Sequence, residues 1–440
     1  MSYDSTAAGN QGIGRLTSET FASGPNQATT GGYAYTYDIR GRQTGWTMSV
    51  GTTSYPFTTT FNDASQPLTL TYPDGAVQTT GYTAQGWLAS VTEQQGTTTT
   101  TLVNNLLYAG QPGASQQVTG ATVGNGVYQW SLGYDTNLRV NDTKAQKVAT
   151  STTLFDQTRS FDAVGNVLST TTTLAAGTDN QVFCYDAVNR LTWAGNNATP
   201  ACGGTVTTGT LTSGRYQQPY AYDVLDHLTT GPKGTGYAYT DPAHVSAVTS
   251  APSYTATYDA AGSMTARSGQ PMTYDALRRL LTWQDKATAP TKTESYAYNG
   301  AGERVQQVNG TTTTTYVGGF EEVSKTGTTT NITKYYQAGP VTAVKVNGVF
   351  SYLVQDRLKS VSIALNATGS VTATALYAPY GVVRYKSGLS YDHARYYDST
   401  VGQFTSADSV QGPNRYVYLA AILSYQPTRP DITGQCVKLS

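Results

Sequence analysis

Short stretches of alternating apolar and polar residues follow one another along this chain, separated by turns rich in Gly, Asn and Asp. In segments such as Arg190–Thr192 (Arg-Leu-Thr), the alternation places the leucine on one face of a strand and its neighbours on the other. Threonine runs, among them Thr97–Thr101 and Thr311–Thr315, favour strands over helices because a branched β-carbon restricts side-chain rotation. The 34 tyrosines fit the same pleated, half-buried surface. The pattern therefore predicts an all-β fold.

One motif recurs along the first three quarters of the chain: an aromatic residue, then Asp or Asn, two or three variable residues, often Gly, and a short strand. Several neighbouring copies lie about two dozen residues apart. Clear copies begin at Tyr37, Tyr134, Phe161, Tyr185, Tyr222, Tyr258 and Tyr274, and looser copies at Phe61, Tyr82, Tyr239 and Tyr298.

Each copy is typical of a β-hairpin. The carboxylate at the first turn position accepts hydrogen bonds from backbone N–H groups two residues on, and Gly three residues after it suits the last turn position or a left-handed bulge residue. A single hairpin is barely stable alone, so the copies are expected to pair edge to edge in one continuous antiparallel sheet. The twist of strands would curl that sheet into a spiral or shell. The repeated Asp is therefore predicted to be a turn residue and not a catalytic one.

The Tyr-Asp-x-x-Gly-Arg-Leu-Thr pattern resembles the YD repeat of RHS proteins, teneurins and the C component of insecticidal Tc toxins. The second half is similar, in the order and spacing of its motifs, to the RHS-associated core of that family. Those motifs are Tyr335–Gly339, Tyr352–Ser360, Asn366–Gly369, Tyr377–Gly381, Ala394–Asp398, Gly402–Asp408 and Asn414–Tyr418. The resemblance implies a YD-repeat array over 1–310, the core over 311–419, and over 420–440 a degenerate core end without a toxin domain.

The resemblance also implies a function. In the family a hollow β-shell encloses a C-terminal toxin, and the end of the core acts as an aspartate-dependent autoprotease. Two carboxylates that share a proton suit that chemistry, because close like charges cannot both ionise. By motif position the candidates are Asp408 and Asp431; the alternative is that both are turn residues. The family's Asp-Pro boxes read Asp408-Ser409 and Asp431-Ile432 here, so we expect no enzyme activity.

The charge balance excludes several partner classes. The chain has 27 basic and 27 acidic residues and a pI of about 6.8, so nothing predicts binding to nucleic acid or to an anionic membrane. No apolar run approaches the roughly 20 residues of a membrane helix, and the first residues lack the pattern of a signal peptide. The resemblance nevertheless implies a secreted or cell-surface protein.

Cysteine and histidine are scarce. Cys184 and Cys202 lie within one repeat, where they form either a disulfide or a pair of buried free thiols. Neither Cys-x-x-Cys nor a Cys/His cluster occurs, so we predict no metal and no cofactor. His227, which replaces a repeat residue, and His244 are expected at the surface.

Three functions compete. The leading hypothesis is a structural scaffold, part of a shell, whose partner is a neighbouring toxin or shell polypeptide, or itself through open sheet edges that would build a fibre or tube. The second is a cell-surface module that binds glycans or proteins through exposed aromatic residues. Its candidates are Trp46, Trp87, Trp193 and Trp283, for which inward packing is the alternative. The third is the residual autoprotease.

Overall fold

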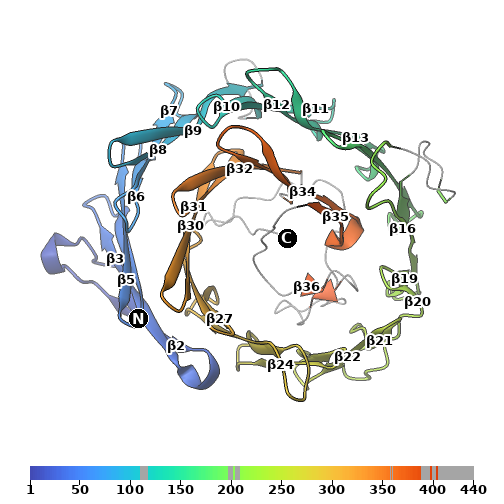
Figure 1. Ribbon diagram of the computed structural model, residues 1–440. Coiled ribbons are helices and arrows are strands. Elements are labelled where there is room, and N and C mark those ends of the chain that lie inside the picture. The colour runs from blue at the N-terminus through green and yellow to red at the C-terminus, as the bar shows by residue number, and fades with distance from the viewer. Residues whose placement is uncertain are drawn as a thin grey trace. The chain divides into compact units, whose positions relative to one another are not determined.

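The computed structural model describes residues 1–109, 117–196, 202–203, 209–356, 358, 360–387, 397–398 and 403–404. Within these ranges the chain forms β-strands and three short 3-10 helices, and no α-helix (Figure 1). Among the residues described, no helix is long and apolar enough to cross a membrane. The all-β class and the long antiparallel sheets predicted from the sequence are confirmed.

The chain divides into two compact units, each built from two separate segments: residues 1–127 with 272–352, and 128–271 with 353–440. These units do not end at residues 310 and 419, the boundaries predicted from the sequence. Those boundaries separate different sequence motifs, not compact units, and they stay predictions.

In the first unit, each strand pairs antiparallel with the next one along the chain. Its first segment contains η1 (Ala7–Gly9), η2 (Pro25–Gln27) and strands β1 (Ser2–Tyr3), β2 (Leu16–Ser23), β3 (Thr29–Tyr37), β4 (Gln43–Val50), β5 (Thr53–Phe61), β6 (Pro67–Thr71), β7 (Val77–Tyr82), β8 (Leu88–Gln95), β9 (Thr98–Tyr108) and β10 (Val118–Val123). Its second segment contains β24 (Gln270–Tyr274), which begins at the boundary, β25 (Leu280–Gln284), β26 (Thr293–Tyr298), β27 (Arg304–Asn309), β28 (Thr312–Val317), β29 (Glu321–Thr326), β30 (Thr329–Ala338), β31 (Val341–Val346) and β32 (Val349–Gln355).

In the second unit most strands also pair antiparallel with the next one along the chain, but three of them form a separate sheet that is not hydrogen-bonded to the strands before and after it in sequence. This unit contains β11 (Tyr128–Tyr134), β12 (Val140–Lys147), β13 (Thr153–Phe161), β14 (Val167–Leu174), β15 (Gly177–Tyr185), β16 (Leu191–Gly195), β17 (Gln217–Pro219), β18 (Ala221–Tyr222), β19 (Leu228–Gly231), β20 (Gly234–Thr235), β21 (Ser250–Ala251), β22 (Tyr254–Tyr258) and β23 (Met264–Arg267). The second segment of this unit, from residue 353 on, contains β33 (Val361–Asn366), β34 (Val371–Tyr377), η3 (Pro379–Gly381), β35 (Val383–Ser387), β36 (Tyr397–Asp398) and β37 (Gln403–Phe404).

The core of the first unit lies between two layers, in which β26 to β32 face the strands of the first segment (Figure 1). Aromatic rings from both layers meet there. The Phe320 ring lies 5.6 Å from that of Phe57, and the Tyr72 and Tyr336 rings are 5.4 Å apart. In β5 the buried side chains occupy alternate positions, whereas β31 is buried at five consecutive positions. Burial of aromatic area between the layers holds them together.

Candidate functional site

The repeat motif forms one local structure, which the turn at Asp275 illustrates. One carboxylate oxygen accepts hydrogen bonds from the backbone N–H groups of Leu277 and Arg279, both at 2.9 Å. The other oxygen accepts one from Arg279 Nε at 2.6 Å. The predicted turn role of the repeated Asp is thereby confirmed at this copy.

The same arginine reaches the next repeat. Arg279 Nη1 donates to the backbone carbonyl of Asn299 at 2.8 Å, and its guanidinium lies over the Tyr298 ring, 5.1 Å from the centroid. We call the interaction of the turn carboxylate with the residue four positions later, and of that residue with the next turn, the clasp. Equivalent arginine clasps start at Asp38, Asp135 and Asp186.

The aromatic residue of the motif ties the repeat to the preceding one. The hydroxyl of Tyr298 donates to the carbonyl of Leu280 at 2.7 Å, and that of Tyr37 to the carbonyl of Leu16 at 2.7 Å. The strand register shifts by one residue at this aromatic, for example between Thr36 and Tyr37. This bulge accompanies a left-handed residue at the turn, Gly41 in that copy with φ +79°, as the spacing predicts.

The clasp keeps its carboxylates ionised. At Asp38, Asp135 and Asp186 burial opposes a low pKa, but hydrogen bonds from the backbone and from the clasp arginine outweigh it, so each pKa lies below the usual value. These aspartates accept hydrogen bonds from their own turns and from the clasp arginines, as the predicted turn role requires.

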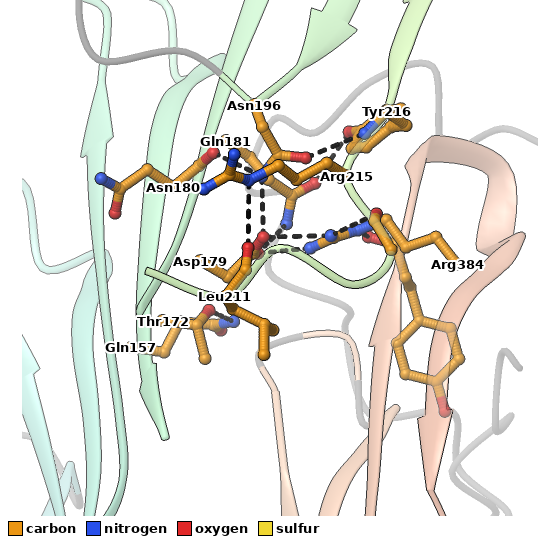
Figure 2. A network of polar contacts seen from close by, with 12 residues as sticks. Gln157, Thr172, Asp179, Asn180, Gln181, Asn196, Leu211, Arg215, Tyr216 and Arg384 are labelled. Atoms are coloured by element: carbon orange, nitrogen blue, oxygen red, sulfur yellow. Dashed lines mark hydrogen bonds and ion pairs between the residues drawn. The ribbon is translucent and has the colours of Figure 1, made fainter. Parts of the chain in front are cut away.

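A more deeply buried network lies in the second unit (Figure 2). Asp179 on β15 is 1% exposed, and Arg384 on β35 points its guanidinium at it. Arg384 Nη1 lies 3.0 Å from Asp179 Oδ1, while Nη2 contacts Oδ2. Asn196 Nδ2 donates to Oδ1 at 2.7 Å, and Gln181 Nε2 donates to Oδ2 at 3.3 Å.

The rest of the network holds the arginine. Arg384 also donates to the carbonyls of Tyr377 (3.1 Å) and Gly214 (3.0 Å), and its guanidinium lies over the Tyr216 ring at 5.2 Å. The Tyr216 hydroxyl donates to Gln181 Oε1 at 2.8 Å, and burial raises its pKa above the usual range. Each oxygen of Asp179 has two donors, so the charge is satisfied within the protein and the network is suited to joining strands rather than to binding a ligand.

The first unit contains a comparable set of buried ion pairs. Lys345 Nζ on β31 lies 2.7 Å from Glu93 Oε1 on β8 and 2.9 Å from Gln95 Oε1. Lys334 Nζ on β30 lies 2.5 Å from Asp74 Oδ2, in the turn between β6 and β7. In this unit, too, cations on late strands pair with carboxylates on early ones.

The residues predicted to form sites fall into three groups. Asp408 and Asp431 lie outside the described residues, so their role stays a prediction. The sulfur atoms of Cys184 and Cys202 are placed as a disulfide with Cα atoms 5.9 Å apart, one of the two alternatives left open by the sequence. Within the described ranges no group of three or more His, Cys, Asp or Glu side chains is placed to hold a metal ion.

The expectation that His227 lies at the surface is wrong. Its side chain is 6% exposed, because it occupies the clasp position of its repeat and reaches the next turn. The position of His227 in the motif could have indicated this burial, because Arg190 and Arg279, which occupy the same position in other repeats, are part-buried as well.

The tryptophans proposed as glycan contacts make internal contacts. Trp46 stacks on Phe57 with centroids 4.2 Å apart, the Trp87 ring lies 4.9 Å from that of Tyr108, and Trp193 is 8% exposed. The Lys292 ammonium lies over the ring of Trp283, 5.4 Å from the centroid. The contacts of Trp46, Trp87 and Trp193 favour inward packing, whereas the lysine over Trp283 is itself half-exposed.

Comparison with solved structures places this fold. The chain is similar to TcdB2-TccC3 without its hypervariable C-terminal region (TM-score 0.77, 16% identity, 94% of this chain and 24% of that one). It is also similar to TcdB2-TccC3-Cdc42, with a TM-score of 0.76, 17% identity, and coverage of 94% of this chain and 24% of that one. A third similar structure is the Photorhabdus luminescens Tc holotoxin pore with a mutated TccC3, with a TM-score of 0.75, 17% identity, and coverage of 95% of this chain and 24% of that one.

This chain spans about a quarter of the length of those chains. No family model matches the chain, and no curated protein matches it. At these identities the likeness shows the fold, and the YD/RHS-repeat fold implied by the sequence motifs is confirmed. The assignment of 311–419 to an RHS-associated core stays a prediction.

Proposed function

We propose that this chain, which has the fold of the YD/RHS-repeat proteins, is a structural scaffold that forms part of a β-sheet shell around a polypeptide cargo. The observation that carries the proposal is the clasp, which recurs in several turns and uses the charged side chains of the motif to join neighbouring repeats. The fold of the TcdB2-TccC3 chains supports it. The scaffold is secreted or displayed at the cell surface and has a toxin-like polypeptide as its partner.

The buried ion pairs support the same function. A wall that retains a cargo has to resist local opening, and pairs such as Asp179–Arg384 and Glu93–Lys345 join strands from distant parts of the sequence. Breaking a buried pair on one side leaves an uncompensated charge, so these contacts make separation of the joined strands costly.

The direct test is a cargo-protection experiment on the full chain. A small folded reporter is attached after Ser440, and its digestion by a broad-specificity protease is compared with that of the free reporter. Particles are imaged in parallel by electron microscopy. Slower digestion together with hollow particles is expected; digestion at the rate of the free reporter, from solid particles, would contradict the shell.

Assembly of copies is the second part of the proposal. β35 ends the order of its sheet among the described residues, and it pairs with β34 on one side. An open strand edge invites a further strand, from another copy or from a partner polypeptide. Size-exclusion chromatography with light scattering distinguishes these outcomes, since a compact monodisperse monomer would remove the fibre version and leave the scaffold itself intact.

Self-cleavage at Asp408 and Asp431 is the third function carried forward. The motif positions support it and the altered boxes count against it. Intact mass of the purified protein, compared with Asp431→Asn, tests it: identical full-length masses would end the idea.

A further inference from the structure

One clasp has a different chemistry from the arginine clasps. At Asp223 the clasp position is occupied by His227. Asp223 Oδ1 accepts hydrogen bonds from the N–H groups of Leu225 (2.8 Å) and His227 (3.0 Å), as in the other copies. Its Oδ2 lies 3.0 Å from His227 Nδ1, where an arginine clasp places Nε. The carboxylate is thus fixed by the backbone, with one oxygen directed at an imidazole.

The other side of the imidazole faces a hydroxyl. His227 Nε2 lies 3.2 Å from Ser246 Oγ, in the turn that follows β20. An ionised carboxylate only accepts hydrogen bonds, so the contact with Asp223 requires the neutral ring to carry its proton on Nδ1. Nε2 then has a free lone pair directed at the serine hydroxyl. The three side chains have the connectivity of a nucleophile, a base and a carboxylate that orients the base.

The surroundings favour this arrangement. His227 is 6% exposed and stacks on the Tyr239 ring with centroids 4.4 Å apart, which fixes its orientation. Burial opposes a low pKa at Asp223, but the hydrogen bonds from His227 and Leu225 lower it below the usual value, so the carboxylate stays ionised.

Ser246 lies between β20 and β21 and is of intermediate exposure. Asp241 and Thr249, in the same connection between β20 and β21, line an open depression of about 460 Å³, and neither Ser246 nor His227 is among its lining residues.

From this geometry we propose that Ser246 is a nucleophile toward small activated esters of carboxylic and phosphonic acids, with His227 as its general base and Asp223 as a positioning residue. Ser246 Oγ attacks the carbonyl carbon while its proton passes to His227 Nε2. The bond from that carbon to the leaving oxygen then breaks, and the proton on Nε2 passes to that oxygen. The products are an acyl ester of Ser246 and an alcohol, and water later hydrolyses the ester with His227 again as base.

A fluorophosphonate probe tests the proposal on the full chain. Oγ bonds to phosphorus, the phosphorus–fluorine bond breaks, fluoride leaves and the proton goes to His227. Peptide mapping by mass spectrometry is expected to find one adduct, on Ser246. No adduct, or adducts spread over many hydroxyl groups, would overturn the proposal.

His227→Arg is the matched variant, because it restores the clasp that Arg190 makes in the preceding repeat and removes the base. Folding is checked by circular dichroism and thermal unfolding. The labelling rate is expected to fall about 100-fold or more, the usual contribution of a general base. Labelling of this variant at the wild-type rate would show that the histidine serves the clasp alone. Asp223→Asn, which retains the turn acceptor, is expected to shift the pH profile of labelling, and an unchanged profile counts against its positioning role.

Discussion

Arg384 Nη1 lies 3.0 Å from Asp179 Oδ1, although 205 positions separate the two residues in the sequence. Both side chains are almost fully buried, at 5% and 1% exposure. The pair joins β35 to β15 inside the second unit. Because both charged groups are removed from water, each is stabilised only by its ion pair with the other and by the hydrogen bonds around it.

The first prediction is that Arg384→Met destabilises the packing of β35 on β15 by about 3–5 kcal/mol, because it leaves a buried carboxylate without its cation. Hydrogen exchange of the amides in both strands measures the loss. The double variant Asp179→Leu/Arg384→Met is expected to recover part of it, because no charge is then stranded.

An exposed ion pair provides the control. Arg40 Nη2 lies 3.8 Å from Asp63 Oδ1, with side chains 52% and 108% exposed. Arg40→Met is expected to cost less than about 1 kcal/mol. Equal small effects at both sites would mean that the buried network does not hold the strands together.

Local sequence patterns predicted most of the fold, but they did not predict contacts between residues far apart in the sequence. The turn aspartate, the left-handed residue and the return strand at copies such as Tyr37 follow from rules that act over a few residues. The Asp179–Arg384 pair does not, because nothing local distinguishes Arg384 from an exposed arginine. His227 shows the same limit: the sequence placed it at the surface, whereas it contacts Asp223 in its own turn and Ser246 in the next one.

The second prediction concerns pH. Burial raises the pKa of Glu321 to about 7, with the Lys334 cation opposing the shift and the Asp74 carboxylate adding to it. Its Oε2 is buried without a hydrogen-bond partner among the described residues. The folded state therefore favours the protonated form, whereas the unfolded chain ionises near the ordinary value of 4.5. Stability of the first unit should fall by about 1–2 kcal/mol, after allowance for solvent screening, as pH rises from about 4.5 to about 7.

Glu321→Gln removes this titration while keeping the size of the side chain. The variant's urea midpoint is expected to vary less than that of the wild type between pH 5 and about 7.5. The pKa of Asp74 is lowered, mainly by Lys334 against the effect of burial, so its contribution is lost only in stronger acid. A wild-type profile that rises over the same range would contradict the assignment to Glu321.

The third prediction is that Cys184 and Cys202 are oxidised when the protein is produced in an oxidising compartment. Their separation of 18 residues closes a loop, for which chain entropy predicts a stabilisation of about 3 kcal/mol. Non-reducing peptide mapping is expected to find one linked peptide. Cys202→Ser should lower the thermal midpoint and free the thiol of Cys184 for alkylation on unfolding, whereas Cys436→Ser should leave the linked peptide in place. Alkylation of all three thiols in the unreduced, unfolded wild type, where a disulfide would leave only Cys436 to react, would establish the free-thiol alternative.

The last prediction tests the clasp as the link between repeats. Arg279 contacts the Asp275 carboxylate, the Asn299 carbonyl and the Tyr298 ring at once, which requires a planar guanidinium. Arg279→Lys keeps the charge but cannot make all three contacts, so we expect a loss of about 1–2 kcal/mol. Arg278 in the same turn is exposed, and Arg278→Lys is the matched control with no expected change.

The location of the stability loss in Arg279→Lys shows whether the clasp links neighbouring repeats. In an array whose members contact only their neighbours, faster hydrogen exchange should be confined to the strands on either side of the turn, β24 to β27. A loss spread evenly over the first unit would mean instead that the packing between its layers, and not the clasp, joins one repeat to the next. Because both mechanisms are present in this unit, the spatial extent of the change separates them where its size alone would not.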